Sequence, residues 1–315
     1  MRIVFMGSPE FAIIPLQLLI LNGHAVSAVY TRTDKPGGRG RAPLPPPIKE
    51  AALSLNLPVI QLPGLKKPEA IAQLAQFKPE AIVVAAFGQI LPQDVLDIPC
   101  YGCINIHPSL LPRYRGASPV AAAVLSGDEF AGVSVMRLDA GMDTGPVFSR
   151  AQIPILPYDT AGSLTKRLFQ IGGWMLIEVL ANLPGGNLLP EPQNASEATY
   201  THEITKEEGK INWQLTAAEI WRMVRAYQPW PEAYTLWQGK QLKVIEAFPV
   251  SVRKNPEAGQ VIELSPAGNP VKAAVGVGTG QGVLGLLKVQ MEGKRAMLAA
   301  DFIRGQRAFI GSILS

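Results

Sequence analysis

Three polar residues stand where a predicted parallel sheet would hold substrate. Asn105 and His107 end a short apolar run, and Asp143 lies in the glycine-rich segment LDAGMDTG (138–145) after another such run. Because side chains of a strand alternate between its two faces, Asn105 and His107 are expected to share one face. Ligands of parallel sheets bind at the carboxyl ends of the strands. The three residues are therefore a candidate catalytic trio.

The chemistry that suits this trio is attack by an amine on an activated acyl carbon. The intermediate carries a negative oxygen, which the amide of Asn105 and a protonated His107 could stabilise; one preorganised donor is worth about 10²–10³ in rate. A carboxylate at Asp143 would orient the imidazole and could position a water that takes a proton from the amine. From these residues alone, structural roles stay open, since a histidine in a strand often packs and an asparagine often caps a turn.

The elements that must position the trio alternate between short apolar strands and helices. Strands are expected at 2–6, 26–31, 58–61, 81–85, 102–107 and 132–138, and helices at 10–22, 48–56, 68–76, 117–126 and 160–182. Such alternation is typical of an α/β fold with a parallel sheet and helices on both faces. We predict a Rossmann-like domain over residues 1–188.

A second, smaller domain is indicated by a change of pattern. Residues 189–205 are expected to be a linker, because the surrounding segment is rich in Pro, Gly and Asn. Beyond Pro229-Trp230-Pro231, alternating runs at 241–248, 258–264, 270–277 and 282–289 indicate short antiparallel strands. We therefore predict a β-barrel of the oligonucleotide-binding type over 206–315. Thr216-x-x-Glu219 has the pattern of a capping box and predicts a helix start.

Composition excludes several classes of protein. Of the 315 residues 47% are hydrophobic, which is enough for a folded core. No run of about 18 apolar residues is present, so we predict no membrane span, and the opening segment suggests a strand rather than a signal peptide. We expect a cytoplasmic protein, acting as a monomer. The two cysteines, Cys100 and Cys103, are too few for a zinc site, and no metal is expected.

A long basic loop is expected between the second strand and the second helix. Residues 31–49, TRTDKPGGRGRAPLPPPIK, hold five Lys and Arg, one acid, three glycines and five prolines. Glycine and proline at this density prevent regular structure, and long loops in compact domains are usually functional. The net charge of +4 permits a polyanionic partner without requiring one.

With their flanking residues, the trio resembles a known family. NIHPSLLPRYRG (105–116) and LDAGMDTG resemble the signature of enzymes that use 10-formyltetrahydrofolate as a formyl donor. The resemblance implies that Asn105, His107 and Asp143 are catalytic. It implies a folate site with AFGQILP (86–92) as a second wall. The residues that it implies for the first wall of this site are Ser109, Leu110, Leu111 and Pro112.

The likeness to methionyl-tRNA formyltransferases extends over nearly the whole chain. FMGSPEFA (5–12), DKPGGRGR (34–41), ITKEEGKINW (204–213) and RAYQPWPEAY (225–234) resemble segments of that family. This implies transfer of a formyl group to the free amino group of methionyl initiator tRNA, giving N-formylmethionyl-tRNA for translation initiation. The first domain would be catalytic and the second would bind tRNA. Arg41, helped by Arg39 and Arg32, would contact the tRNA.

Three other functions remain to be distinguished. A sugar-nucleotide N-formyltransferase would share the trio and the folate motif, but a compact sugar does not need a basic loop of this reach. A dinucleotide-dependent oxidoreductase is disfavoured because Gly7-Ser8-Pro9 lacks the further glycines of the dinucleotide motif. A non-catalytic RNA-binding module would give no reason for the trio.

Overall fold

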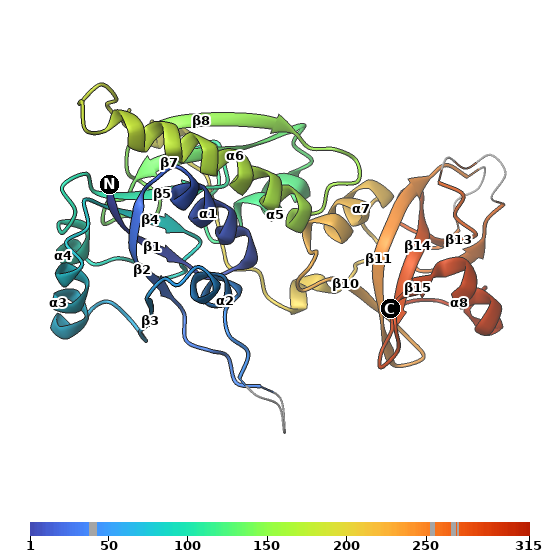
Figure 1. Cartoon of the computed structure of the whole chain (residues 1–315). Coiled ribbons are helices and arrows are strands. Elements are labelled where there is room, and N and C mark those ends of the chain that lie inside the picture. Colours follow the sequence, from blue (N-terminus) through green and yellow to red (C-terminus); the bar gives the residue numbers. More distant parts are fainter. Residues whose placement is uncertain (38–42, 253–255, 266–268, 270) are drawn as a thin grey trace. The chain divides into compact units, whose positions relative to one another are not determined.

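The computed structural model describes residues 1–37, 43–252, 256–265, 269 and 271–315 (Figure 1). The chain divides into two compact units. Unit 1 comprises Met1–Pro119, Phe130–Pro154 and Thr165–Thr201, and unit 2 comprises Val120–Glu129, Ile155–Leu164 and His202–Ser315.

Unit 1 is built on a seven-stranded sheet in the order β3-β2-β1-β4-β5-β7-β8. Its strands are β1 (Arg2–Gly7), β2 (Ala25–Thr31), β3 (Val59–Gln61), β4 (Ala81–Ala85), β5 (Cys103–His107), β7 (Phe130–Arg137) and β8 (Val147–Pro154). The first five strands in this order pair in parallel, whereas β7 pairs antiparallel with β5 and β8 antiparallel with β7. The predicted α/β class is confirmed, with an antiparallel edge on a mostly parallel sheet.

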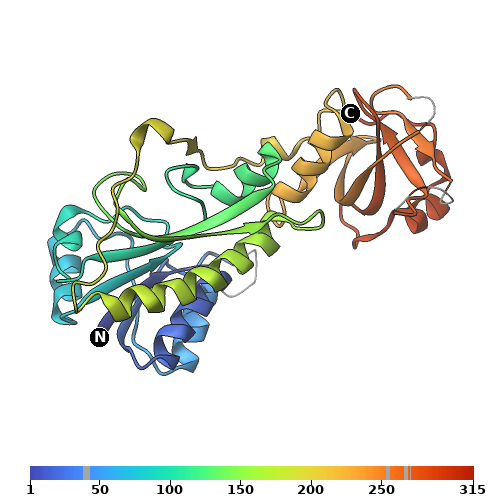
Figure 2. The same ribbon diagram turned by 90° about the horizontal axis from the view of Figure 1, so that it is seen from above.

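Helices cover both faces of this sheet (Figures 1 and 2). They are α1 (Ile13–Leu21), α2 (Pro47–Ser54), α3 (Pro68–Gln76), α4 (Gln93–Leu96) and α6 (Ala161–Asn182). Helix α6 lies very close to the sheet at Gly172. A Cβ atom added to this residue would stand 2.6 Å from Ile106 and 2.8 Å from Val133. Residues that alternate with Ile106 must therefore point to the other face.

The opposite face carries the second half of the core. There, Cys103 of β5 packs in one buried cluster with Leu74 of α3, Val95 of α4 and the strand residues Val4 and Ile82. Since Cys103 shares its face with the next odd-numbered residues of β5, the side chains of Asn105 and His107 project from this face. The strand therefore uses one face for packing against α6 and the other for polar groups.

Unit 2 contains a six-stranded antiparallel sheet. Its strands are β10 (Ala233–Trp237), β11 (Lys240–Val250), β12 (Val261–Glu263), β13 (Val275–Gly278), β14 (Val283–Met291) and β15 (Met297–Leu298). The order β10-β11-β14-β13-β12, with β15 beside β14, makes an antiparallel half-barrel. Helices α7 (Ala217–Ala226) and α8 (Ala299–Gly305) lie in the part of unit 2 that the structure describes. A further helix, α5 (Pro119–Ser126), begins at the boundary of the two units.

The tryptophans of unit 2 differ in their surroundings. Trp237 stacks edge-on against Phe302 and Phe309, and the indole of Trp213 donates to the hydroxyl of Thr235 at 3.0 Å. Both tryptophans are buried.

The capping box is confirmed, since the Thr216 hydroxyl accepts from the amide of Glu219 and the Glu219 carboxylate accepts from the amide of Thr216. These contacts account for the predicted helix and for the core under the sheet.

Within the described ranges, no helix is both long enough and apolar enough to cross a membrane.

Candidate active site

Strand β5 places the first two members of the trio side by side on one face. Asn105 pairs with Val84 of β4 and with Met136 of β7, and His107 pairs with Ser134 of β7. Both polar side chains are buried, with Asn105 8% and His107 5% exposed. Burial of an amide and an imidazole among strands is unfavourable unless they are hydrogen-bonded, so polar groups at this end of β5 indicate a functional site.

The third member reaches the site from an unexpected direction. Because β7 is antiparallel to β5, it ends beside Cys103, where the amide of Leu138 donates to the Cys103 carbonyl at 2.7 Å. The following loop still brings a carboxylate oxygen of Asp143 to 3.6 Å from Nδ1 of His107. Asp143 has φ of 53°, the left-handed conformation that aspartate tolerates better than most residues. The loop therefore doubles back along the strand to complete the group.

Oxygen acceptors lie near both ring nitrogens of His107. Nε2 is 3.0 Å from the carbonyl oxygen of Tyr114, which can only accept, so Nε2 carries a hydrogen in this orientation. Nδ1 faces the Asp143 carboxylate at an ion-pair distance rather than a hydrogen-bond distance. The same carboxylate oxygen accepts from the amide of Gly116 at 2.9 Å. The imidazole and the carboxylate are thus each fixed by the backbone of 114–116.

The SLLP segment is fixed by polar contacts from the neighbouring strands. The Ser134 hydroxyl donates to the Ser109 carbonyl at 2.7 Å and accepts from the Leu111 amide at 3.1 Å. The guanidinium of Arg150 donates to the Leu111 carbonyl at 2.9 Å. Leu111 itself is buried with Met136, so it supports the segment from within the core.

The rest of the segment lies against nearby chain. The Ser109 hydroxyl donates to the carbonyl of Arg113 at 2.6 Å, and the Pro112 carbonyl accepts from the amide of Thr199 at 3.3 Å. Leu110 lies over Gly132, where an added Cβ would come within 2.3 Å of it. The four residues therefore form one rigid turn directly after the trio's strand.

Residues 86–92 follow β4, the strand next to β5. Phe87 and Leu91 are buried, and Gly88 has φ of 74°. Arg32 donates to the carbonyls of Phe87 and Gly88 at 3.3 and 3.0 Å. Arg32 therefore fixes the backbone of the 86–92 segment, a role separate from the tRNA contact expected of it.

The base of the predicted basic loop is held by paired contacts. The amides and carbonyls of Lys35 and Leu44 bond to each other in both directions, at 3.0 and 2.9 Å. The carboxylate of Asp34 pairs with Lys49 at 2.8 Å, and hydrogen bonds from Lys49 and Gln61 lower the pKa of that carboxyl. Arg39 and Arg41 lie outside the described residues.

Nothing among the described residues forms a group of three or more His, Cys, Asp or Glu that could hold a metal. Burial and the nearby carboxylate of Asp97 raise the pKa of the Cys103 thiol to about 12. A thiol held protonated in this way is a poor nucleophile and a poor metal ligand. Cys103 is therefore a residue of the buried core cluster.

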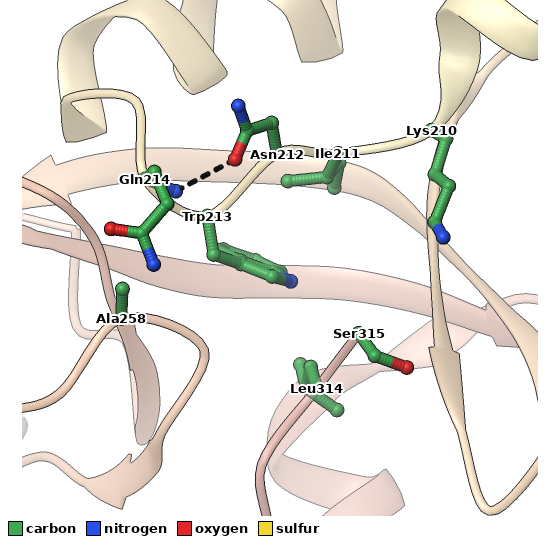
Figure 3. A pocket seen from close by; sticks show the side chains of 8 residues that line it. All are labelled: Lys210, Ile211, Asn212, Trp213, Gln214, Ala258, Leu314 and Ser315. Atoms are coloured by element: carbon green, nitrogen blue, oxygen red, sulfur yellow. Dashed lines mark hydrogen bonds between the residues drawn. The ribbon is translucent and has the colours of Figure 1, made fainter.

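A pocket of about 380 Å³ lies in unit 2 (Figure 3). It is lined by Lys210, Ile211, Asn212, Trp213, Gln214, Ala258, Leu314 and Ser315. In Figure 3 the Asn212 side chain is bonded to the amide of Gln214, at 3.0 Å. No carboxylate or imidazole side chain lines the pocket, so it lacks the acid–base groups found around β5.

Comparison with known proteins assigns the chain to a family. The formyl transferase family profile matches residues 1–180, and the profile of the formyl transferase C-terminal domain matches residues 203–307. A methionyl-tRNA formyltransferase of Dehalococcoides mccartyi is 52% identical over 313 residues, covering 99% of this chain and 97% of the relative. The chain belongs to the methionyl-tRNA formyltransferase family. A Chloroflexus aurantiacus member is 44% identical over 308 residues, covering 98% of both chains.

Solved structures share the fold at lower identity. A methionyl-tRNA formyltransferase from Clostridium thermocellum has a TM-score of 0.57 at 18% identity, covering 79% of this chain and 93% of the other. WlaRD, a sugar 3N-formyl transferase, has a TM-score of 0.65 at 18% identity, covering 94% and 99%. HypX from Aquifex aeolicus has a TM-score of 0.68 at 18% identity, and the chain spans 48% of it. The fold is therefore common to several formyl-transfer proteins.

Two residues that fix the SLLP segment of this candidate site were not predicted from the sequence. Ser134 could have been noticed, because it is a polar residue inside the otherwise apolar strand β7. Arg150 lies on the edge strand β8, where charged residues are common and attract no notice. Both act on the backbone of the SLLP turn rather than on the trio.

We predict that Ser134→Ala weakens donor binding by about tenfold while turnover at saturation changes little. The substitution leaves a buried amide at Leu111 and a buried carbonyl at Ser109 without their partner, which costs about 1–3 kcal/mol. Ser149→Ala in β8 is the matched control. The test is the Michaelis constant for the folate donor; an unchanged constant in Ser134→Ala would show that this hydroxyl does not shape the donor site.

Proposed function

We propose that this chain transfers the formyl group of 10-formyltetrahydrofolate to the free amino group of methionyl initiator tRNA. The product, N-formylmethionyl-tRNA, would serve translation initiation in the cytoplasm. The observation that supports this proposal most directly is the position of the Asp143 carboxylate, 3.6 Å from Nδ1 of His107. His107 shares its face of strand β5 with Asn105. We also propose that the chain acts as a monomer, with a catalytic domain at 1–188, a linker at 189–205 and a tRNA-binding domain at 206–315.

The reaction that this group suits is direct transfer between nitrogens. The amine of the acceptor forms a bond to the formyl carbon, and the carbonyl electron pair moves to its oxygen. The amide of Asn105 donates to this oxyanion, and His107, when protonated, adds positive charge beside it. When the oxyanion collapses, the bond to the folate nitrogen breaks, that nitrogen takes up a proton and tetrahydrofolate leaves.

Proton removal from the amine falls to Asp143. One of its carboxylate oxygens is bound by the amide of Gly116 and faces His107. The other can accept a hydrogen bond from a water placed between the carboxylate and the amine, which makes Asp143 a general base through water. Ser109, Leu110, Leu111 and Pro112, with 86–92, would form the walls that hold the folate.

The acceptor is tested by offering the protein each of the two candidate acceptors in turn. Protein and 10-formyltetrahydrofolate are incubated either with charged initiator tRNA or with an amino-sugar nucleotide, and formyl transfer is followed. Transfer to the tRNA alone supports the proposal, which relatives 52% and 44% identical over nearly the whole chain also favour. Transfer to the sugar nucleotide alone would refute it.

We predict that Asn105→Ala and His107→Ala each lower turnover by about 10²-fold or more, because each removes one group that stabilises the oxyanion. Asp143→Asn should be comparably severe. Binding of folate and tRNA should change little, as measured by equilibrium titration. His202→Ala removes an exposed histidine of unit 2 and is the matched control. Near-normal turnover of His107→Ala would end this mechanism.

We predict that Arg41→Ala raises the Michaelis constant for charged tRNA by about tenfold. The constant should also depend less on salt, because each lost phosphate contact lowers the slope of log affinity against log salt concentration by about one. Folate binding should be unaffected. Arg39 and Arg32 are proposed as helpers, although Arg32 also holds 86–92. Lys66→Ala, a charge removed outside the loop, is the control. A parent-like constant and salt slope in Arg41→Ala would remove the loop from tRNA recognition.

A further inference from the structure

The segment 191–201, here called the return segment, crosses unit 1 after α6 and bonds to the loops that carry the site. The backbones of Glu191 and Val147 bond in both directions at 2.8 Å. Further along, β9 (Tyr200–Thr201) pairs in parallel with β6 (Arg115–Gly116). The return segment is therefore part of the site's framework, although its composition is that of a loop.

One side chain of the return segment bonds directly to the backbone beside the catalytic carboxylate. The amide nitrogen of Gln193 donates to the carbonyl of Asp143 at 2.8 Å and to the carbonyl of Gly145 at 2.6 Å. Its amide oxygen accepts from Nη2 and Nε of Arg115 at 2.8 and 3.1 Å. Gln193 thus joins the backbone of the Asp143 loop to the guanidinium of Arg115 through a single planar amide.

This join acts on a residue whose backbone is itself constrained. The backbone of Asp143 lies in the left-handed region, with φ of 53°. Residues that have a Cβ atom adopt this conformation at an energetic cost, so surrounding contacts must stabilise it. Its carboxylate is fixed by the amide of Gly116, and its carbonyl is fixed by Gln193. Without the Gln193 contact, the Gly116 amide alone would hold the carboxylate, and its distance from the imidazole could change.

The imidazole is held through the same return segment. The Tyr114 carbonyl, which accepts from His107, belongs to a residue with φ of 58° whose amide donates to the Thr199 hydroxyl at 2.8 Å. The amide of Arg115 donates to the carbonyl of Thr199 at 2.9 Å. The Asp143 carboxylate and the His107 imidazole therefore depend on Gln193 and Thr199 for their positions.

The group that accepts from the Arg115 guanidinium here is the neutral amide oxygen of Gln193, not a carboxylate. The guanidinium is buried at 3% exposure, and Nη1 also donates to the hydroxyl of Tyr200 at 3.2 Å. A neutral acceptor at Gln193 leaves the Asp143 carboxylate as the negative group beside His107. The amide is thus the one side chain of this length that accepts from Arg115 and donates to two carbonyls together.

We propose that Gln193 is a positioning residue for formyl transfer: it sets the Asp143 carboxylate against His107 by fixing the carbonyls of Asp143 and Gly145. This inference rests on the proposed function, because it assigns Asp143 a role in the transfer. Gln193 does not need to touch either substrate to act in this way. A misplacement of about 1 Å in a catalytic group can cost as much as about 10² in rate.

The test separates the two halves of the Gln193 amide. Gln193→Glu is isosteric and still accepts from Arg115, but it cannot donate to the two carbonyls and places negative charge beside them. Gln193→Ala loses both contacts. We expect both variants to lower kcat for formyl transfer to charged initiator tRNA by about 10–10²-fold, with the Michaelis constants for tRNA and donor near those of the parent.

Asn194→Ala is the matched control, since that neighbouring side chain caps its own turn by accepting from Ser196. It should keep the kcat of the parent. If Gln193→Ala does not fold, Gln193→Glu decides alone. A Gln193→Glu enzyme with the parent's kcat, or a loss that falls only on the Michaelis constants, would overturn the proposal. If the parent itself does not formylate charged tRNA, the proposed function has failed instead.

Discussion

The placement of one carboxylate against one imidazole is the constraint around which unit 1 is organised. Asp143 lies 3.6 Å from His107, and neither residue is near the other in the chain. The Asp143 carboxylate is partly buried, so hydrogen bonds must compensate for the hydration that it loses. Here the compensation comes from the Gly116 amide, while the Tyr114 carbonyl fixes the far side of the ring. The loops after β5 and β7 can be understood as supports for these two contacts.

The supports extend outward through polar side chains. Ser134 and Arg150 hold the SLLP turn, and Gln193 and Thr199 bond to the backbone beside the ion pair. Each of these side chains acts on backbone amides or carbonyls, whose positions are more restricted than those of long side chains. In the proposed reaction, groups fixed in this way would need little reorganisation when charge develops in the transition state. The same fold is found in several formyl-transfer proteins.

Much of this arrangement was accessible from local sequence signals. The apolar run into Asn105 and His107 predicted a strand with both side chains on one face, and β5 has that form. Thr216 and Glu219 predicted a helix start because a capping box depends only on nearby residues. The alternation of strands and helices predicted the parallel part of the sheet. The family resemblance grouped 109–112 as one wall of a folate site, but the turn that these residues form is seen only in the structure.

Other features depend on contacts that the sequence does not encode locally. The apolar pattern of β7 is the same whichever way the strand runs, so its antiparallel direction could not be predicted. Strand β8 is half exposed and contains Arg150 and Gln152, which obscured its alternation. Gln193 lies in an irregular segment rich in Pro and Asn, and its partners are 48 to 78 residues away. Such residues become visible only when the partner backbones are placed.

The most direct test of the central claim is a double-mutant cycle on Asp143 and His107. The rate of formyl transfer in a single turnover, with charged initiator tRNA in excess, is measured for His107→Ala, Asp143→Asn and the double variant. If the two residues act as one unit, the double variant should be no more than a fewfold slower than the slower single variant. If the two losses multiply in full, the residues act independently, and the carboxylate–imidazole pair is not the centre of the site.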